Sequence, residues 1–229
     1  MKRTIRALFA IIIASCLFSV NAGADGREDI HRYIYHLDRT YPRSTQLVIV
    51  LPEKNTDTRS RLYVLEKRNS TWHTIIDGVP ATNGHNGFAP PEQKKEGDGK
   101  TPSGIFKIAY AFGYGTSCDT GLDYRQATEK DVWIDDPRSD DYNRWITGSP
   151  GNYSHEKMKR NDQLYRYGIV VEYNMDPVVK GKGSAIFIHV WRASDKPTSG
   201  CIAVSEESIK KLLAFLDKGK QPVIIMGLL

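Results

Sequence analysis

The sequence predicts a mainly-β domain of the α+β class. Runs rich in Ile, Val and aromatic residues recur along the chain and are typical of buried strands. One clear amphipathic helix stands in the second half, and strands and helices do not alternate as they do in a parallel βαβ sheet. Since no linker rich in Gly, Ser or Pro divides the chain, we expect one domain at 46–229 behind a helical extension at 23–45.

The first 22 residues have the layout of a signal peptide. Lys2, Arg3 and Arg6 precede an apolar stretch at 7–20, and small-residue patterns follow it. The stretch is too short and too weakly flanked to favour a permanent membrane span. A lipoprotein cleavage site at Cys16 is the alternative. Both interpretations predict export, to the periplasm or cell envelope.

The charge of the chain gives little reason to expect a nucleic-acid partner. The formal net charge is +5, and loss of the three cations of the signal peptide lowers it to roughly +2. No His/Cys grouping has the spacing of metal ligands, so we expect no metal and no other cofactor. The sequence leaves the oligomeric state open.

The N-terminal half predicts one helix and several strands. Apolar residues recur at helical spacing over 29–37. The segments 46–51 and 61–66 are extended and predict a hairpin. A loop rich in Gly, Asn, Pro and charge at 80–100 then leads into a strand at 101–108.

The middle of the chain, 114–162, has many turn formers and aromatics but no sustained periodicity, so it predicts no regular element. Its length is sufficient to carry function. The acids and aromatics between Trp133 and Asn143 fit either surface turns stabilised by Asp and Asn or a wall over a substrate site.

The C-terminal third predicts regular structure again. The runs 168–173 and 185–191 suit buried strands. Ser205 is a helix N-cap, and apolar residues share one face of a helix that we expect at about 205–218, ended by Gly219. A final strand is expected at 222–226.

Two cysteines, Cys118 and Cys201, remain after processing, and exported proteins usually form disulfides. One structural disulfide is therefore one interpretation. Cys201, however, follows the loop that begins after His189, at the end of a predicted buried strand. An imidazole there can take the proton of a thiol and so activate it as a nucleophile. Cys118 has no histidine close in sequence and is structural or incidental.

The residue before Cys201 supports this interpretation. Gly200 has no Cβ and lets the backbone approach a substrate carbonyl, so that the N–H groups of Gly200 and Cys201 face a developing oxyanion. The alternative is a core histidine with satisfied hydrogen bonds and a cysteine that serves as a small buried hydrophobe.

Two segments in this order, Gly97-Asp98-Gly99-Lys100-Thr101-Pro102-Ser103-Gly104-Ile105-Phe106 and His189 through Val204, resemble the L,D-transpeptidase family (YkuD or ErfK/YbiS/YcfS/YnhG). The resemblance extends from about residue 46 to the C-terminus. It implies a curved β-sandwich with the 205–218 helix at one side. It also implies a reaction on peptidoglycan stem peptides, in which a thiol releases the terminal D-amino acid and an amine or water resolves the acyl-enzyme.

Carried over by position, the resemblance makes Cys201 the nucleophile and His189 the general base. Ser199 and Gly200 become part of the oxyanion site, and the Val190 carbonyl orients the imidazole. Trp191, Arg192 and Thr198 are the expected substrate-binding residues; Arg192 either holds a substrate carboxylate or is an ordinary exposed arginine.

The chain departs from the common family pattern at three points. Ser199 stands where many members have His, Ala203 stands where many have Arg or Asn, and the spacing from His189 to Cys201 is shorter than usual. These departures indicate a divergent branch and leave the acyl acceptor open. A crosslinking transpeptidase, a carboxypeptidase or amidase that uses water, and a non-catalytic peptidoglycan-binding module of the envelope remain the alternatives.

Overall fold

The computed structural model describes residues 24–52 and 54–227, and strands dominate it, so the predicted mainly-β class is confirmed. The elements in chain order are α1 (Ala24–Thr40), β1 (Gln46–Pro52), β2 (Arg59–Arg68), β3 (Thr71–Thr82), β4 (Phe88–Ala89), β5 (Thr101–Pro102), β6 (Gly104–Gly113), β7 (Tyr124–Gln126), β8 (Asp131–Ile134), β9 (Arg144–Thr147), β10 (His155–Lys157), β11 (Tyr167–Val171), β12 (Phe187–Val190), β13 (Ile202–Val204), α2 (Glu206–Phe215), the 3-10 helix η1 (Lys218–Lys220) and β14 (Val223–Met226).

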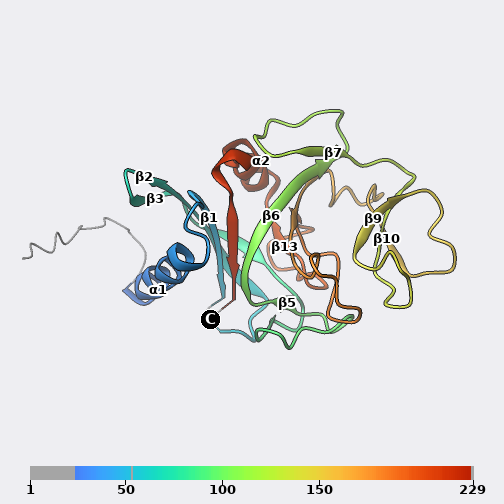
Figure 1. The fold of residues 1–229 in the computed structure, drawn as a ribbon, viewed down its shortest axis with the longest axis horizontal. Coiled ribbons are helices and arrows are strands. Elements are labelled where there is room, and N and C mark those ends of the chain that lie inside the picture. The colour runs from blue at the N-terminus through green and yellow to red at the C-terminus, as the bar shows by residue number, and fades with distance from the viewer. Residues whose placement is uncertain (1–23, 53, 228–229) are drawn as a thin grey trace, which may run out of the picture.

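The main sheet has nine strands and curves back on itself. Its order is β11-β12-β13-β3-β2-β1-β14-β6-β7, and a further pairing of β11 with β6 closes a ring that leaves only β7 outside. The first and last strands, β1 and β14, lie side by side and parallel, with Val48 opposite Ile224. The closed sheet surrounds the largest apolar core (Figure 1).

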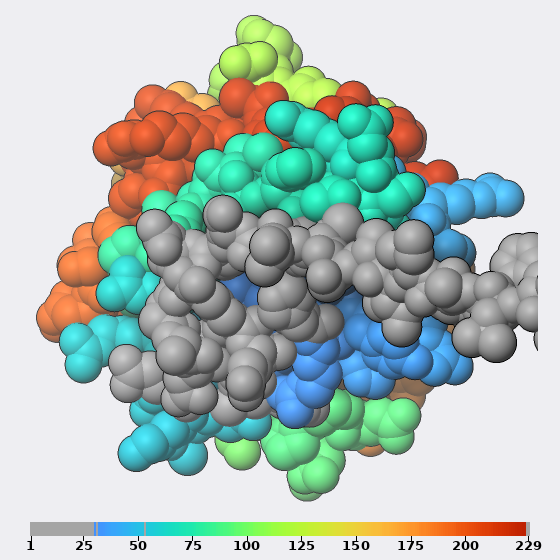
Figure 2. Space-filling model, turned by 90° about the vertical axis from the view of Figure 1, so that its left-hand side faces the viewer, coloured from blue at the N-terminus to red at the C-terminus, as the bar shows by residue number. Residues whose placement is uncertain are grey.

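Strand β1 is buried on both faces, and its side chains alternate between two apolar cores. Val48 and Val50 pack inside the ring, whereas Leu47 and Ile49 pack outside it against α1. The helix contributes three buried side chains to this outer core: Ile30, Tyr33 and Leu37. Figure 1 shows α1 lying beside β1, and Figure 2 shows the same side of the molecule with α1 in blue below the teal β2–β3 hairpin.

Helix α2 begins as predicted and ends earlier. Ser205 is the N-cap, and its hydroxyl accepts a hydrogen bond from the Ser208 N–H at 3.1 Å. The helix ends at Phe215, because Leu216 adopts an extended conformation that places it, fully buried, in the ring core. The Asp217 side chain then caps η1, which contains Gly219, the predicted helix end.

The middle of the chain contains regular structure that the sequence did not reveal. Strands β8, β9 and β10 form a separate three-stranded sheet over the outer face of β12 (Figure 1). Trp133 is 1% exposed and lies edge-on against Phe187 of β12, with ring centroids 5.0 Å apart. Its indole N–H donates to Asn143, whose side-chain oxygen also accepts from the Ala185 N–H. The two ends of the stretch from Trp133 to Asn143 are therefore a buried support behind β12. The residues between them form the predicted surface turns, in which the Asp136 side chain accepts from the Arg138 N–H and Arg138, Asp140 and Asp141 are exposed. The stretch does not line the cavity, so it is not a substrate wall.

The other predicted elements occur, with longer bounds at β1, β2 and α1. The strand predicted at 101–108 is divided into β5 and β6, and the strands β3, β4, β7 and β13 were missed. The signal-peptide prediction, including Cys16, concerns residues outside the described part of the chain. Within the described part, no helix combines the length and apolar character that crossing a bilayer requires.

Candidate active site

The site begins with two neighbouring parallel strands, β12 and β13. Their register places His189 opposite Ala203 and Ile188 opposite Ile202. Ile188 and Ile202 face the ring core, so strand alternation turns His189, Cys201 and Ala203 to the outer face. The β8–β10 region covers this face, which leaves His189 6% and Cys201 7% exposed.

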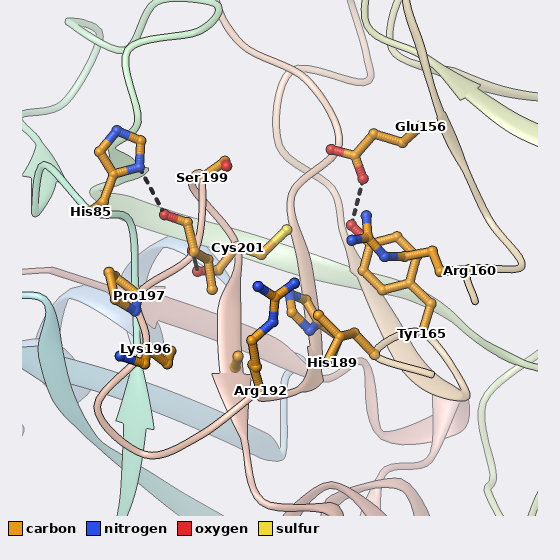
Figure 3. Close-up of a pocket in the computed structure, with 13 residues that line it drawn as sticks. His85, Glu156, Arg160, Tyr165, His189, Arg192, Lys196, Pro197, Ser199 and Cys201 are labelled. Carbon is orange, nitrogen blue, oxygen red and sulfur yellow. Dashed lines mark hydrogen bonds between the residues drawn. The ribbon is translucent and has the colours of Figure 1, made fainter. Parts of the chain in front are cut away.

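A cavity of about 350 Å³ opens over both side chains (Figure 3). Of the residues predicted from sequence, Arg192, Thr198 and Ser199 also line it. Trp191 and Gly200 are not among the lining residues. The predicted site residues thus lie around one cavity, with Trp191 outside it and Gly200 supporting its wall.

His189 is a neutral imidazole of defined tautomer. Its Nδ1 lies 2.8 Å from the Val190 carbonyl oxygen, the contact that the family resemblance implies. Because a carbonyl only accepts hydrogen bonds, Nδ1 carries the proton and Nε2 keeps its lone pair. Burial lowers the pKa of His189 to about 4, so the ring is uncharged at neutral pH.

The Cys201 thiol is protonated. Its sulfur donates to the Ala185 carbonyl at 3.2 Å and accepts from the Phe187 N–H at 3.4 Å. Burial, followed by the negative charge of Glu156, raises the pKa of Cys201 to about 12. Among the described residues, no hydrogen bond joins this sulfur to the His189 ring. Cys201 and His189 are therefore a neutral thiol and a neutral imidazole, and they do not form a thiolate–imidazolium ion pair.

The two described cysteines are both free thiols, so the structure does not contain the disulfide considered from sequence. Cys118 is partly buried beside the ring core, away from the cavity lining.

The loop before Cys201 is held by hydrogen bonds from threonine side chains. The Thr198 hydroxyl donates to the Cys201 carbonyl at 2.6 Å and accepts from the Gly200 N–H at 3.1 Å. The Gly200 N–H therefore already has a hydrogen-bond partner within the protein. Gly200 has φ +150, a conformation that L side chains rarely adopt, and an added Cβ would lie 3.0 Å from the Lys100 carbonyl oxygen.

The Gly-Asp-Gly-Lys-Thr-Pro segment supports this loop from behind. The Thr101 hydroxyl donates to the Gly200 carbonyl at 2.8 Å and accepts from the Gly84 N–H at 2.9 Å. The Asp98 carboxylate accepts from the Lys100 N–H and from the buried Lys94 ammonium. The Thr101 side chain thus holds the backbone of Gly200, the residue directly before the candidate nucleophile.

A second histidine reaches the cavity from another part of the chain. His85 follows β3, and its Nδ1 lies 3.1 Å from the Thr198 carbonyl oxygen. The ring occupies space that Gly99 leaves, because a Cβ on Gly99 would lie 2.2 Å from His85 Nε2. Figure 3 shows His85 on the Ser199 side of the cavity. Sequence analysis missed it, since nothing in its local sequence separates it from any other loop histidine.

The opposite wall comes from the irregular middle segment and was also missed. The Tyr165 hydroxyl donates to Glu156 at 2.5 Å, and the Tyr165 ring lies edge-on to His189 with centroids 5.1 Å apart. Arg160 stacks over Tyr165 and donates to both carboxylate oxygens of Asp162 at 2.9 and 2.7 Å. Arg192 lies 3.5 Å from the same carboxylate and is mostly exposed. The cavity therefore has one acid in its interior and several cations at its rim.

Comparison with known proteins gives one family match. The model of the YkuD family, the L,D-transpeptidase catalytic domain, matches residues 48–225. No curated protein matches the sequence.

Two solved structures show a fold similarity. The helical cell shape determining protein Pgp2 from Campylobacter jejuni is 19% identical with a TM-score of 0.41, over 80% of this chain and 48% of that one. Bd1075 of Bdellovibrio bacteriovorus is 16% identical with a TM-score of 0.42, over 80% of this chain and 47% of that one. The chain spans about half the length of these structures.

Proposed function

Because the chain belongs to the YkuD family of L,D-transpeptidase catalytic domains, we propose that it is a cysteine acyltransferase acting on peptidoglycan stem peptides. The observation that carries the proposal is the shared cavity of Cys201 and His189, on adjacent parallel strands, with the lone pair of His189 Nε2 kept free. The predicted signal peptide assigns the reaction to the cell envelope.

In the proposed acylation, His189 Nε2 takes the thiol proton as the sulfur attacks the carbonyl carbon of the scissile amide. The raised pKa of Cys201 and the lowered pKa of His189 oppose this transfer, so the thiolate is expected to form only as the sulfur bonds to the carbonyl carbon. The N–H groups of Gly200 and Cys201 are the proposed oxyanion donors. The Gly200 N–H must first exchange its Thr198 partner for the substrate oxygen.

The tetrahedral intermediate then collapses. The C–N bond breaks, and His189 returns its proton to the leaving amine, which departs as the terminal D-amino acid. A thioester on Cys201 remains. An amine resolves it as a crosslink, or water resolves it as carboxypeptidase action; both cleave the C–S bond and return a proton to the sulfur.

Acylation by a carbapenem, a mimic of the substrate, tests the nucleophile. Intact-mass spectrometry is expected to show one adduct on the wild type and on Cys118→Ala, and none on Cys201→Ala. Equal adducts on wild type and Cys201→Ala, or no adduct on either, would remove support for the assignment.

An analysis of cell-wall fragments distinguishes an enzyme from a non-catalytic module. Muramidase digests of walls from cells with and without the protein are expected to differ in crosslinked dimers or in trimmed monomers. Equal complementation by wild type and Cys201→Ser would favour the peptidoglycan-binding alternative.

A further inference from the structure

The cavity holds a carboxyl group whose presence acylation does not explain. Glu156 of β10 lines the cavity opposite Ser199, and Figure 3 shows its carboxyl group on the side toward which the Cys201 sulfur points. The negative charge of Glu156 is the second cause of the raised pKa of the thiol. An ionised Glu156 therefore opposes the formation of the thiolate.

Glu156 also lacks a cationic partner. Its one side-chain hydrogen bond comes from the neutral Tyr165 hydroxyl, and within the described chain no Lys or Arg forms an ion pair with it. Burial raises the pKa of the Glu156 carboxyl. The charge of Arg160 lowers this pKa to a smaller extent, but the hydrogen bonds of this guanidinium go to both oxygens of Asp162. Burial thus favours the protonated carboxyl, and a cation brought into the cavity by a ligand would favour the carboxylate.

The charge of Glu156 becomes useful once the acyl-enzyme has formed. The sulfur is then part of a neutral thioester, and His189 is neutral again after protonating the leaving amine. The second step needs an incoming nucleophile, and a primary amine arrives mainly as its ammonium form at neutral pH. An ammonium group entering the cavity finds one unpaired carboxylate.

We propose that Glu156 binds the ammonium group of the acyl acceptor, beside the thioester on Cys201, and takes one of its protons. The proposal rests on the proposed function and makes Glu156 the residue that favours aminolysis over hydrolysis. The amine nitrogen, now carrying a lone pair, attacks the thioester carbon. The C–S bond breaks, and the second proton of the nitrogen passes through His189 to the sulfur. An amide and the free thiol result, and Glu156 releases its proton to solvent.

The interior of the cavity indicates the class of acceptor. At the rim, Arg192 pairs with Asp162 and Lys196 pairs with Asp195, so these cations are matched by acids. Glu156 therefore specifies a primary amine in its ammonium form.

A competition between aminolysis and hydrolysis tests this assignment. The donor is a disaccharide tetrapeptide, the acceptor is free D-methionine, and mass spectrometry measures exchanged tetrapeptide against tripeptide. Glu156→Gln is expected to lower the ratio of aminolysis to hydrolysis at least tenfold and to raise the KM for D-methionine. The same variant is expected to form the carbapenem adduct faster, because the charge that opposes the thiolate is gone. Glu92→Gln, an exposed acid outside the cavity, is the matched control.

An unchanged ratio in Glu156→Gln would overturn the proposal. A wild type that forms neither adduct nor product would instead overturn the proposed function, so the two failures are distinguishable. If the variant does not fold, the same exchange assay is carried out on the wild type with the hydroxy analogue of D-methionine as the acceptor. It lacks the ammonium group and is expected to form at least tenfold less exchange product; equal exchange would overturn the role of Glu156.

Discussion

At the scale of single residues, burial controls the chemistry of the candidate site. The same cover that hides Cys201 and His189 moves their pKa values in opposite directions, upward for the thiol and downward for the imidazole. Both shifts favour the neutral forms. The site is thus expected to be unreactive toward small electrophiles until a ligand changes the surroundings of the sulfur.

Alkylation of Cys201 by iodoacetamide, in a Cys118→Ala background, tests the state of the thiol. Because the thiolate fraction grows tenfold per pH unit below the pKa, we expect the rate to rise about tenfold per unit from pH 7 to pH 10. Circular dichroism at each pH serves as the control for folding. A rate that levels off below pH 8 would instead indicate a preformed thiolate–imidazolium pair.

The lowered pKa of His189 predicts a pH dependence of stability. Between the ordinary pKa of 6.5 and the folded value of about 4, the unfolded state binds a proton that the folded state does not. Stability therefore falls as the pH falls through this window, by about 3 kcal/mol for this residue. Urea unfolding measures the loss of stability between pH 7 and pH 4. This loss is expected to be about 3 kcal/mol smaller in His189→Gln than in the wild type.

The exposed His73 provides the matched control for this measurement. His73→Gln is expected to follow the wild type at both pH values. An identical pH dependence for wild type and His189→Gln would contradict the neutral, buried imidazole.

At the scale of elements, strands β12 and β13 place His189 and Cys201, and segments from elsewhere in the chain hold the loop between them. Thr101, Gly99 and His85 belong to segments that precede Cys201 by about a hundred residues in sequence, yet each is fixed to the 198–200 loop or to its support. The shape of that loop depends on contacts between segments far apart in the chain.

Two glycines of one motif allow a paired test of this dependence. Gly97 and Gly99 have φ of +70 and +67, so an alanine at either is strained by about 1 kcal/mol. An added Cβ meets nothing within 4 Å at Gly97 but overlaps the His85 ring at Gly99. Gly99→Ala is therefore expected to have a free energy of unfolding about 1 kcal/mol lower than Gly97→Ala, because the displaced His85 ring loses its hydrogen bond with the Thr198 carbonyl. Urea unfolding measures this difference.

The control for this pair is a third substitution. In a His85→Ala background the overlap is absent, so Gly99→Ala and Gly97→Ala are expected to cost the same free energy. If the difference between them persisted in that background, the contact between His85 and Gly99 would not be its cause.

The elements also show why part of the site could be predicted from sequence and part could not. β1 and β12 carry continuous apolar runs, and α2 carries an N-cap and one apolar face, so local patterns were sufficient to predict them. β13 has only three residues and β10 has a polar sequence, so neither shows the alternation of apolar residues from which a strand is predicted. His189 and Cys201 stand at the ends of recognisable runs, whereas His85, Glu156 and Tyr165 reach the cavity only through tertiary packing.

At the scale of the whole molecule, α1 is part of the domain's packing although it precedes the family match at 48–225. It covers the outer face of β1 and β14, where Leu47, Ile49 and Ile225 are fully buried. Without the helix, that face would be an exposed apolar patch. We therefore expect the catalytic domain and the 23–45 extension to fold as one cooperative unit.

Alanine substitutions in α1 measure this contribution. Leu37 is fully buried, so Leu37→Ala is expected to lower the free energy of unfolding by about 2–5 kcal/mol. Tyr35, on the same helix, is 61% exposed, and Tyr35→Ala is expected to change it by less than about 0.5 kcal/mol. Equal effects in urea unfolding would show that the helix is not docked as the structure has it.

The predicted export would place Cys201 in an oxidising compartment, where the cover of the β8–β10 sheet has a consequence for the thiol. Peroxide and disulfide exchange consume thiolates that solvent can reach. A buried, protonated sulfur with both of its hydrogen bonds made to backbone groups offers neither the charge nor the access. The wall that shapes the cavity is therefore expected to slow oxidation of the thiol as well, so that the proposed enzyme, if exported, would not require a dedicated reductant.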